Sequence, residues 1–308
     1  MTTILDTILR TTLHPLLHSI HTLYLFIASD LKTIIIPSTI FGLANSLAAQ
    51  SYNLPTPLTP ARTRVLQALT WTLLTLIPFA ISNQLSPSAI VEDTLNKPWR
   101  PLPQTRLTRT QAKNTMLTFY ALSQIHGILT RTGHRQSLAM IPLGTYYNHL
   151  GGADHHPLTR NLTNAAGYLC FTTGAMEAAF GCPLPLTRLP PRLAAWLILL
   201  ATVVFSTIHL QDLYDQEGDR LRARRTLPLV IGDPAARWAA ALPMLVWGAV
   251  CPTFWRVGPW LTIVCVGLAW TVAVRTLLVR SVPGDRVTFR FWNCWVVLVY
   301  LLPVWGSR

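Results

Sequence analysis

Nine long apolar segments, separated by shorter polar stretches, set the pattern of this 308-residue chain. An α-helix needs roughly 17–25 mostly apolar residues to cross a bilayer, and each segment approaches or reaches that length. We predict an all-α, polytopic membrane bundle of about nine transmembrane helices, forming one domain over residues 1–308, with residues 1–28 before the first span. The predicted spans are residues 33–50, 65–82, 112–130, 136–150, 163–181, 193–211, 235–253, 258–280 and 289–305.

Polar side chains interrupt the third and fourth of these spans. They are Asn114, Gln124, His126 and Asn148. A polar side chain is costly inside a membrane unless it faces other helices or a cavity. The two interrupted spans are therefore as consistent with a cavity within the bundle as with a miscount of the spans.

Composition supports a membrane protein and argues against a nucleic-acid-binding one. Charged residues make up 12% of the chain, about half of the roughly 25% found in average soluble proteins. The net charge of +13 comes from Lys and Arg residues scattered between apolar segments, without a recognised nucleic-acid motif. We expect lipid around the protein, no nucleic acid and no obligatory protein partner. The N-terminal stretch MTTILDTILRTTLHPLLHS lacks the pattern of a removable signal peptide.

Basic residues predict how the bundle is oriented. With nine spans and a cytoplasmic N-terminus, the loops after the second and sixth spans face the cytoplasm. Cytoplasmic loops of membrane proteins are enriched in Lys and Arg, and these two loops are the most basic in the chain. They carry Lys97, Arg100, Arg106, Arg109 and Lys113 after the second span, and Arg220, Arg222, Arg224, Arg225 and Arg237 after the sixth.

Each of these two loops also contains an acidic cluster. Asp212, Asp215 and Asp219 are spaced i, i+3, i+7, which would place three carboxylates on one face of a helix. Mg²⁺ prefers one or two carboxylates together with water and phosphate oxygens, and the neighbouring arginines suit a phosphate. The earlier stretch NQLSPSAIVEDTLNKPWRPLP offers Glu92 and Asp93, with the carboxamides of Asn83 and Asn96 and the cations of Lys97 and Arg100. The two clusters together predict a site that clamps a diphosphate.

Structural explanations remain open for both clusters. The three aspartates are also consistent with a solvated helix end that nearby arginines neutralise. Glu92 and Asp93 are also consistent with a polar turn that caps the next helix. Finding both clusters after even-numbered spans favours the shared binding site.

The second cluster resembles a known motif. DLYDQEGDRLRARRTLPL resembles the second aspartate-rich motif of the UbiA superfamily of intramembrane prenyltransferases. The first motif departs from the usual NDxxDxxxD and is similar to that of fungal UbiA-type membrane terpene cyclases. SDLKTIIIPSTIFGL, TYYNHLGG and RNLTNAAGY also resemble that branch.

This resemblance implies a set of site residues at the cytoplasmic mouth of a central cavity. The candidate Mg²⁺ ligands are Asn83, Glu92, Asp93, Asp212, Asp215 and Asp219. The candidate diphosphate contacts are Lys97, Arg100 and Arg224. Asp93, Asp215 and Asp219 are the candidate catalytic residues, and Tyr147, Asn148 and Asn164 are possible pocket residues.

The implied activity is a class I, Mg²⁺-dependent terpene cyclisation. An isoprenyl diphosphate, farnesyl in preference to geranylgeranyl, would ionise, cyclise and release diphosphate. The alternative is a prenyltransferase that moves the prenyl group onto an aromatic or other small acceptor, while a transporter fits the paired acidic and basic loops poorly. The expected location is the endoplasmic reticulum membrane, with the active-site mouth toward the cytoplasm.

Three further polar residues carry open or structural interpretations. Glu177 lies near the end of the fifth predicted span, so it is either a functional residue inside the membrane or part of an exposed helix end. His155 and His156 have no third ligand nearby, so we interpret them as surface residues rather than a metal site.

Overall fold

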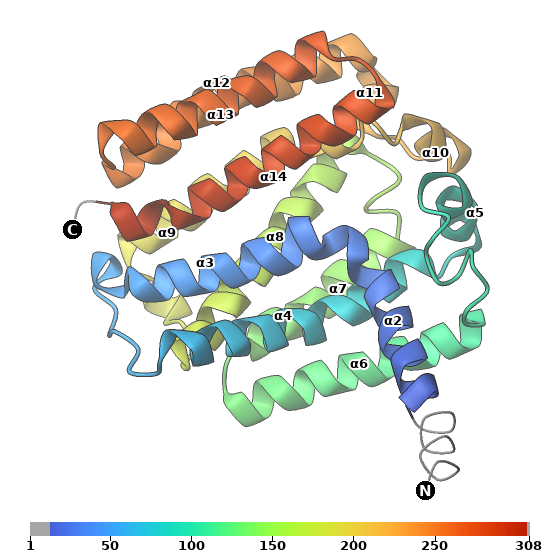
Figure 1. Cartoon of the computed structure of the whole chain (residues 1–308), viewed down its shortest axis with the longest axis horizontal. Coiled ribbons are helices and arrows are strands. Elements are labelled where there is room, and N and C mark those ends of the chain that lie inside the picture. Colours follow the sequence, from blue (N-terminus) through green and yellow to red (C-terminus); the bar gives the residue numbers. More distant parts are fainter. Residues whose placement is uncertain (1–12, 307–308) are drawn as a thin grey trace, which may run out of the picture.

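The computed structural model describes residues 13–306, and all of its regular structure is helical. The predicted all-α fold is therefore confirmed, whereas the first twelve residues of the N-terminal segment lie outside the described range. The α-helices are α2 (His14–Ile27), α3 (Ile36–Leu47), α4 (Ala61–Gln84), α5 (Pro87–Asn96), α6 (Arg109–Thr130), α7 (His134–His149), α8 (Pro157–Phe180), α9 (Pro191–Thr207), α10 (Gln216–Leu221), α11 (Leu227–Ile231), α12 (Asp233–Trp255), α13 (Pro259–Leu278) and α14 (Val282–Trp305). Most of the long helices run side by side, and the short helices α5 and α10 lie at one end of the bundle (Figure 1).

Six helical segments among the described residues are long and apolar enough to cross a membrane. They are His14–Leu47, Ala61–Gln84, Pro191–Gln211, Asp233–Trp255, Pro259–Leu278 and Val282–Trp305. The other three predicted spans coincide with α6, α7 and α8, which are long helices with more polar sequences. The membrane character is thus confirmed, and the count of nine crossings stays a prediction.

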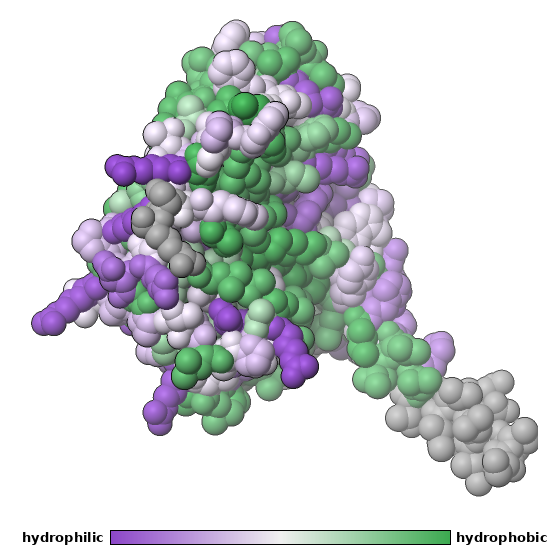
Figure 2. All heavy atoms as spheres, turned by 60° about the vertical axis from the view of Figure 1, so that its left-hand side comes forward, coloured by the Kyte–Doolittle hydropathy of each residue, from purple (hydrophilic) through white to green (hydrophobic). Residues whose placement is uncertain are grey.

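The outer surface of the bundle suits lipid. Large apolar side chains are exposed along several helices, including Trp260 on α13 at 81% and Leu278 at 76%. Figure 2 shows apolar residues over much of one face, with many of the hydrophilic side chains toward its margins. Extensive exposed apolar surface marks a membrane or protein contact, and the long apolar helices identify the contact as lipid.

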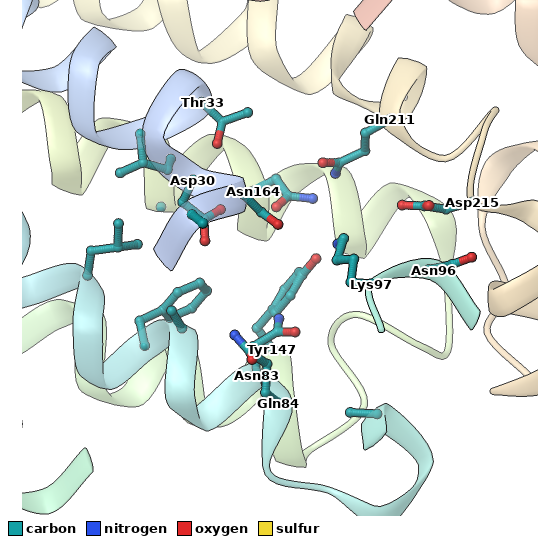
Figure 3. Close-up of a pocket in the computed structure, with 18 of the residues that line it drawn as sticks. Asp30, Thr33, Asn83, Gln84, Asn96, Lys97, Tyr147, Asn164, Gln211 and Asp215 are labelled. Carbon is teal, nitrogen blue, oxygen red and sulfur yellow. The ribbon is translucent and has the colours of Figure 1, made fainter. Parts of the chain in front are cut away.

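The first membrane segment is irregular where it meets the interior of the bundle. Between α2 and α3 the chain forms a 3₁₀ turn, η2 (Ala28–Asp30), and a π turn, η3 (Leu31–Ile35). Pro37 in the first turn of α3 has no N–H to donate to the preceding turn, and its ring crowds the carbonyl four residues earlier. Such π turns are frequent at functional sites, and this one turns Asp30 and Thr33 toward the interior (Figure 3).

Glu177 connects several segments of the chain near the C-terminal end of α8. Its carboxylate is 1% exposed and accepts hydrogen bonds from the Gly133 N–H at 2.9 Å and the Leu184 N–H at 3.0 Å. It also pairs with Arg135 at 2.6 Å. The interpretation as an exposed helix end is therefore wrong. Glu177 instead joins α8 to the start of α7 and to the segment before α9.

Close helix packing depends on two glycines of α3 and α8. A Cβ atom at Gly42 would lie 2.5 Å from the Ala175 carbonyl oxygen, and one at Gly174 would lie 2.0 Å from the Trp71 ring. Small residues allow membrane helices to approach closely. These contacts hold α3 and α4 against α8, which forms one wall of the cavity described below.

Candidate active site

A single cavity of about 440 Å³ collects most of the predicted site residues. This volume lies within the range of roughly 300–1,000 Å³ for small-molecule sites. One part of its wall is apolar and aromatic: Ile34, Leu76, Phe79, Met140, Leu143 and Phe171. The polar part includes the predicted residues Asn83, Glu92, Asp93, Lys97, Arg100, Tyr147, Asn164, Asp215 and Arg224. Asp212, Asp219 and Asn148 do not line it.

The first acidic motif forms the short helix α5. Ser86 caps the helix by accepting a hydrogen bond from the Ala89 N–H at 3.1 Å, and Pro87 occupies the first turn. Glu92 and Asp93 lie inside this helix and are both buried. They do not cap a following helix, so the alternative interpretation of these residues is wrong.

Arginines bind both carboxylates of α5. Arg100 Nη1 donates to both oxygens of Asp93, at 2.8 and 2.9 Å. Glu92 accepts from Arg222 at 3.2 Å and from Arg224 at 3.3 Å. Burial tends to raise the pKa of Glu92, but Arg224 and Arg222 outweigh it and lower that pKa below its usual value. The pKa of Asp93 is raised because burial outweighs Arg100.

The second acidic motif is not a single helical stripe. Asp212 lies in a turn, Asp215 precedes α10, and only Asp219 lies within that helix. The expected face of three carboxylates is therefore replaced by three separate environments. Asp212 pairs with Arg160 at 2.9 Å, and Asp219 pairs with Arg224 at 2.7 Å.

A glycine brings the two motifs into contact. A Cβ atom at Gly218 in α10 would lie 2.2 Å from Nδ2 of Asn96 at the end of α5. Any larger residue would push this carboxamide away. The sequence DxxDxxGD therefore includes its glycine because α5 and α10 must touch here.

Asp215 and Lys97 are the charged side chains of the two motifs that face the cavity without an ion pair among the described residues (Figure 3). Burial raises the pKa of Asp215, opposed by the charge of Lys97. Asp219 retains one oxygen, Oδ2, that is buried and has no hydrogen-bond partner in the described part of the chain. Burial raises the pKa of Asp219 to about 6.

Sequence reasoning missed two residues of this site, Arg160 and Asp154. Arg160 on α8 binds Asp212 and also donates to the Tyr147 hydroxyl at 2.9 Å. Asp154 accepts from Arg222 at 3.3 Å and from Arg224 at 3.0 Å, which lowers its pKa despite burial. The signal for Arg160 was present in RNLTNAAGY as a cation at the start of a predicted span.

The two predicted surface histidines, His155 and His156, and the predicted pocket residue Asn148 all lie outside the cavity wall. His155 and His156 are exposed, and His156 Nδ1 caps α8 by accepting from the Leu158 N–H at 3.2 Å. Their interpretation as surface residues is confirmed. Asn148 lies outside the cavity wall, where its Oδ1 accepts from Asn83 Nδ2 at 3.1 Å. Asn83 is therefore oriented by Asn148.

The donor set suits Mg²⁺ that arrives with a phosphate-bearing ligand. Within residues 13–306, no three His, Cys, Asp or Glu side chains form a ready metal cluster. Mg²⁺ needs only one or two carboxylates when phosphate oxygens and water complete its shell. Asp215 supplies such an oxygen at the cavity wall, and the buried Asp219, which does not line the cavity, keeps one oxygen, Oδ2, without a hydrogen-bond partner among the described residues. The residues present therefore fit the ion.

Comparison with known sequences identifies related enzymes. Residues 35–295 match the model of the UbiA prenyltransferase family. The fumagillin beta-trans-bergamotene synthase af520 of Aspergillus fumigatus is 27% identical over 92% of this chain and 91% of its own length. The somaliensene A/B synthase of Streptomyces somaliensis is 28% identical over 100% of both chains. The polyprenyl transferase eriF of Hericium erinaceus is 27% identical over 72% of both.

Solved structures share the fold at lower sequence identity. A UbiA homolog from Aeropyrum pernix matches with a TM-score of 0.63 and 17% identity, covering 85% of this chain and 94% of its own. A UbiA homolog from Archaeoglobus fulgidus bound to GPP and Mg²⁺ matches with a TM-score of 0.58 and 12% identity, covering 88% and 98%. Since the family model spans most of the sequence, this protein is an enzyme of the UbiA prenyltransferase family.

Proposed function

We propose that this enzyme is a membrane-bound terpene cyclase that ionises an isoprenyl diphosphate and closes the resulting allylic cation onto its own chain. The observation that carries the proposal is one cavity with a charged part beside an apolar, aromatic part. A prenyl diphosphate has the same division, with a charged head and a hydrocarbon tail. Farnesyl diphosphate is the preferred substrate, with geranylgeranyl diphosphate as the longer possibility.

In this proposal the charged part holds the diphosphate. Lys97 contacts the phosphate oxygens, since it faces the cavity without an acidic partner among the described residues. Asp215 and Asp219 would hold Mg²⁺, which when bound there neutralises the charge that develops on the leaving diphosphate. The other predicted ligands, Asn83, Glu92, Asp93 and Asp212, take part by keeping the motifs in place through their own hydrogen bonds and ion pairs.

Arg100 and Arg224 have two tasks in the proposal. Each neutralises a carboxylate of the motifs, at 2.8 Å from Asp93 and 2.7 Å from Asp219 respectively. Each also lines the cavity, where a guanidinium has spare N–H groups for a phosphate oxygen. Nε of Arg100 is buried without a partner within the described part of the chain, and it supplies such a donor.

In this proposal the aromatic part of the cavity wall stabilises the allylic cation and shields it from water. The rings of Phe79 and Tyr147 lie 6.2 Å apart, and those of Phe79 and Phe171 lie 6.4 Å apart. Aromatic faces attract a cation, and an apolar wall keeps out water that would trap it as an alcohol. Cyclisation then follows from the fold of the hydrocarbon chain within this wall.

A prenyltransferase is the second candidate, because the family and the similar polyprenyl transferase of Hericium erinaceus have that chemistry in their names. The test is incubation of purified protein with farnesyl or geranylgeranyl diphosphate and Mg²⁺, with and without an aromatic acceptor. Cyclic terpene without acceptor supports the cyclase. Product only when the acceptor is present would reject it in favour of the transferase.

The proposed location is the endoplasmic reticulum membrane with the cavity mouth toward the cytoplasm. Both acidic motifs lie in the basic loops that the positive-inside rule assigns to the cytoplasm. Isoprenyl diphosphates are too strongly charged to cross a bilayer freely, so a cytoplasmic mouth suits a substrate delivered in water. Protease protection of a tag near Lys97 in sealed microsomes tests this orientation.

A further inference from the structure

Asp30 is an acidic residue of the cavity that has no place in the acidic motifs. It ends the 3₁₀ turn η2 inside the first membrane segment, directly before the π turn η3. Its side chain lines the cavity and forms no ion pair among the described residues. An ionisable residue within a membrane span is a functional candidate, because burial there is costly.

Asp30 and the proposed metal ligand Asp215 occupy different sides of the same cavity. Figure 3 shows Asp30 and Asp215 on opposite sides, with Asn164, Tyr147 and Lys97 between them. Asp215 adjoins the diphosphate region through α10, whereas Asp30 comes from the first membrane segment. The cavity therefore contains two separate carboxylate positions.

Positive charges lie near Asp30 without pairing with it directly. Lys32, Lys97 and Arg100 all act on its carboxylate electrostatically. Their charge opposes the penalty of placing an acid in this span. None of them is within ion-pair distance, so no cation among the described residues binds this carboxylate directly.

From this geometry we infer that Asp30 is the catalytic base that accepts the proton lost when cyclisation ends. The inference rests on the proposed cyclase function. A C–H bond next to the last cationic carbon breaks, its electron pair forms the new C=C bond, and the proton moves to a carboxylate oxygen of Asp30. Water at the cavity mouth later takes that proton and restores the carboxylate.

The other ionisable groups of the cavity suit this step less well. The lysines and arginines have no lone pair to offer when protonated. Glu92 and Asp93 are engaged by arginines at 2.8–3.3 Å. Asp215 lies on the diphosphate side, where it is proposed to hold metal. Asp30 is thus the carboxylate of the described cavity wall that remains available to the hydrocarbon part of the substrate.

The test separates ionisation from termination in the Asp30→Asn variant. Purified wild type and variant in detergent receive farnesyl diphosphate and Mg²⁺, and both released diphosphate and terpene products are measured. We expect diphosphate release within about threefold of wild type, because Asn keeps the shape and the ionising groups are untouched. General-base catalysis contributes roughly 10²–10⁴-fold, so we expect the main hydrocarbon per diphosphate to fall at least about tenfold, replaced by alcohols or other olefins.

Two further variants secure the interpretation. Ser29→Ala changes a neighbouring cavity-lining polar group without removing a charge, and its products should match wild type. Asp30→Glu restores a carboxylate one methylene further out and should recover elimination, with a changed position of the double bond. It also keeps the inference testable where Asp30→Asn fails to fold.

Each outcome decides a different claim. An unchanged product pattern in Asp30→Asn would overturn the inference, because the leaving diphosphate would then be the base. Loss of diphosphate release in a folded Asp30→Asn protein would also overturn it, since Asp30 would then act in substrate binding or ionisation. Failure of the wild type to form any cyclic product without an acceptor would instead reject the proposed function.

Discussion

Asp212 and Asp215 are predicted to differ sharply in what they contribute to stability, although they lie three residues apart in one motif. Asp212 pairs with Arg160 at 2.9 Å, and the two side chains are 2% and 7% exposed. Asp215 makes no ion pair among the described residues, and burial raises its pKa. An account in which both are only metal ligands would make them equivalent in the metal-free protein.

The magnitude follows from what each substitution leaves behind. Asp212→Ala strands the buried guanidinium of Arg160, with the neutral Tyr147 hydroxyl as its close remaining partner at 2.9 Å. Removing one partner of a buried ion pair costs about 3–5 kcal/mol. Asp215→Ala removes an unpaired acid whose raised pKa opposes folding at neutral pH, so this variant should be at least as stable as wild type. Both variants should lose cyclase activity.

The assay is thermal unfolding in detergent without Mg²⁺ or diphosphate, followed by tryptophan fluorescence. At about 2–4 °C per kcal/mol, the unfolding midpoint of Asp212→Ala should lie at least about 5 °C below that of wild type. The midpoint of Asp215→Ala should not lie below that of wild type. Asp285→Ala is a control away from the cavity, because it breaks a buried pair with Arg237 at 2.7 Å and should lower stability as well. Equal midpoints for the Asp212 and Asp215 variants would refute the reasoning.

Three further predictions concern the contact between motifs, the cavity wall and pH. Gly218→Ala places a Cβ 2.2 Å from Asn96 Nδ2, so turnover should fall at least about tenfold. The free energy of unfolding should decrease by only about 1–3 kcal/mol. Gly167 lines the cavity, and a Cβ there meets no atom within 4 Å; Gly167→Leu should fold normally but reduce kcat/KM for geranylgeranyl diphosphate more than for farnesyl diphosphate. Asp219, with its pKa raised to about 6, is mostly ionised at pH 7 and mostly neutral at pH 5, so the Mg²⁺ affinity of the protein should fall about tenfold from pH 7 to pH 5.

Each of these has a clear contrary result. Wild-type turnover in Gly218→Ala would show that the contact of α5 with α10 is dispensable. Equal loss for both substrates in Gly167→Leu would show that this part of the wall does not limit chain length. Mg²⁺ affinity that is constant between pH 7 and pH 5, measured by titration calorimetry, would remove Asp219 from the metal site.

The helices of this fold are largely readable from the sequence, because each must present an apolar face to lipid or to its neighbours. The irregular segment at residues 28–35 was not predicted. Pro37 gave a local signal, but whether a proline kinks a helix, widens a turn or starts a new helix depends on neighbouring helices. The position of Asp30 in the cavity depends on this irregular backbone, which the sequence alone does not determine.

The site was predictable in its residue types more than in its pairings. Acidic clusters in two basic loops indicated a phosphate site, and both motifs do meet, through Asn96 and Gly218. The partners of the carboxylates were not predictable, since Arg160 lies 52 residues before Asp212 and reaches it only through tertiary packing. Helical spacing also misled the expectation for Asp212, because a turn precedes α10.

The most direct test of the central claim is the stoichiometry of the acceptor-free reaction. Purified wild-type protein is given farnesyl diphosphate and Mg²⁺ alone, and released diphosphate and cyclic terpene are counted in the same sample, with Asp215→Asn as the inactive control. The proposal predicts one cyclic terpene per diphosphate released by the wild type and neither from the control. Diphosphate release without cyclic product, or no release until an acceptor is added, would contradict it.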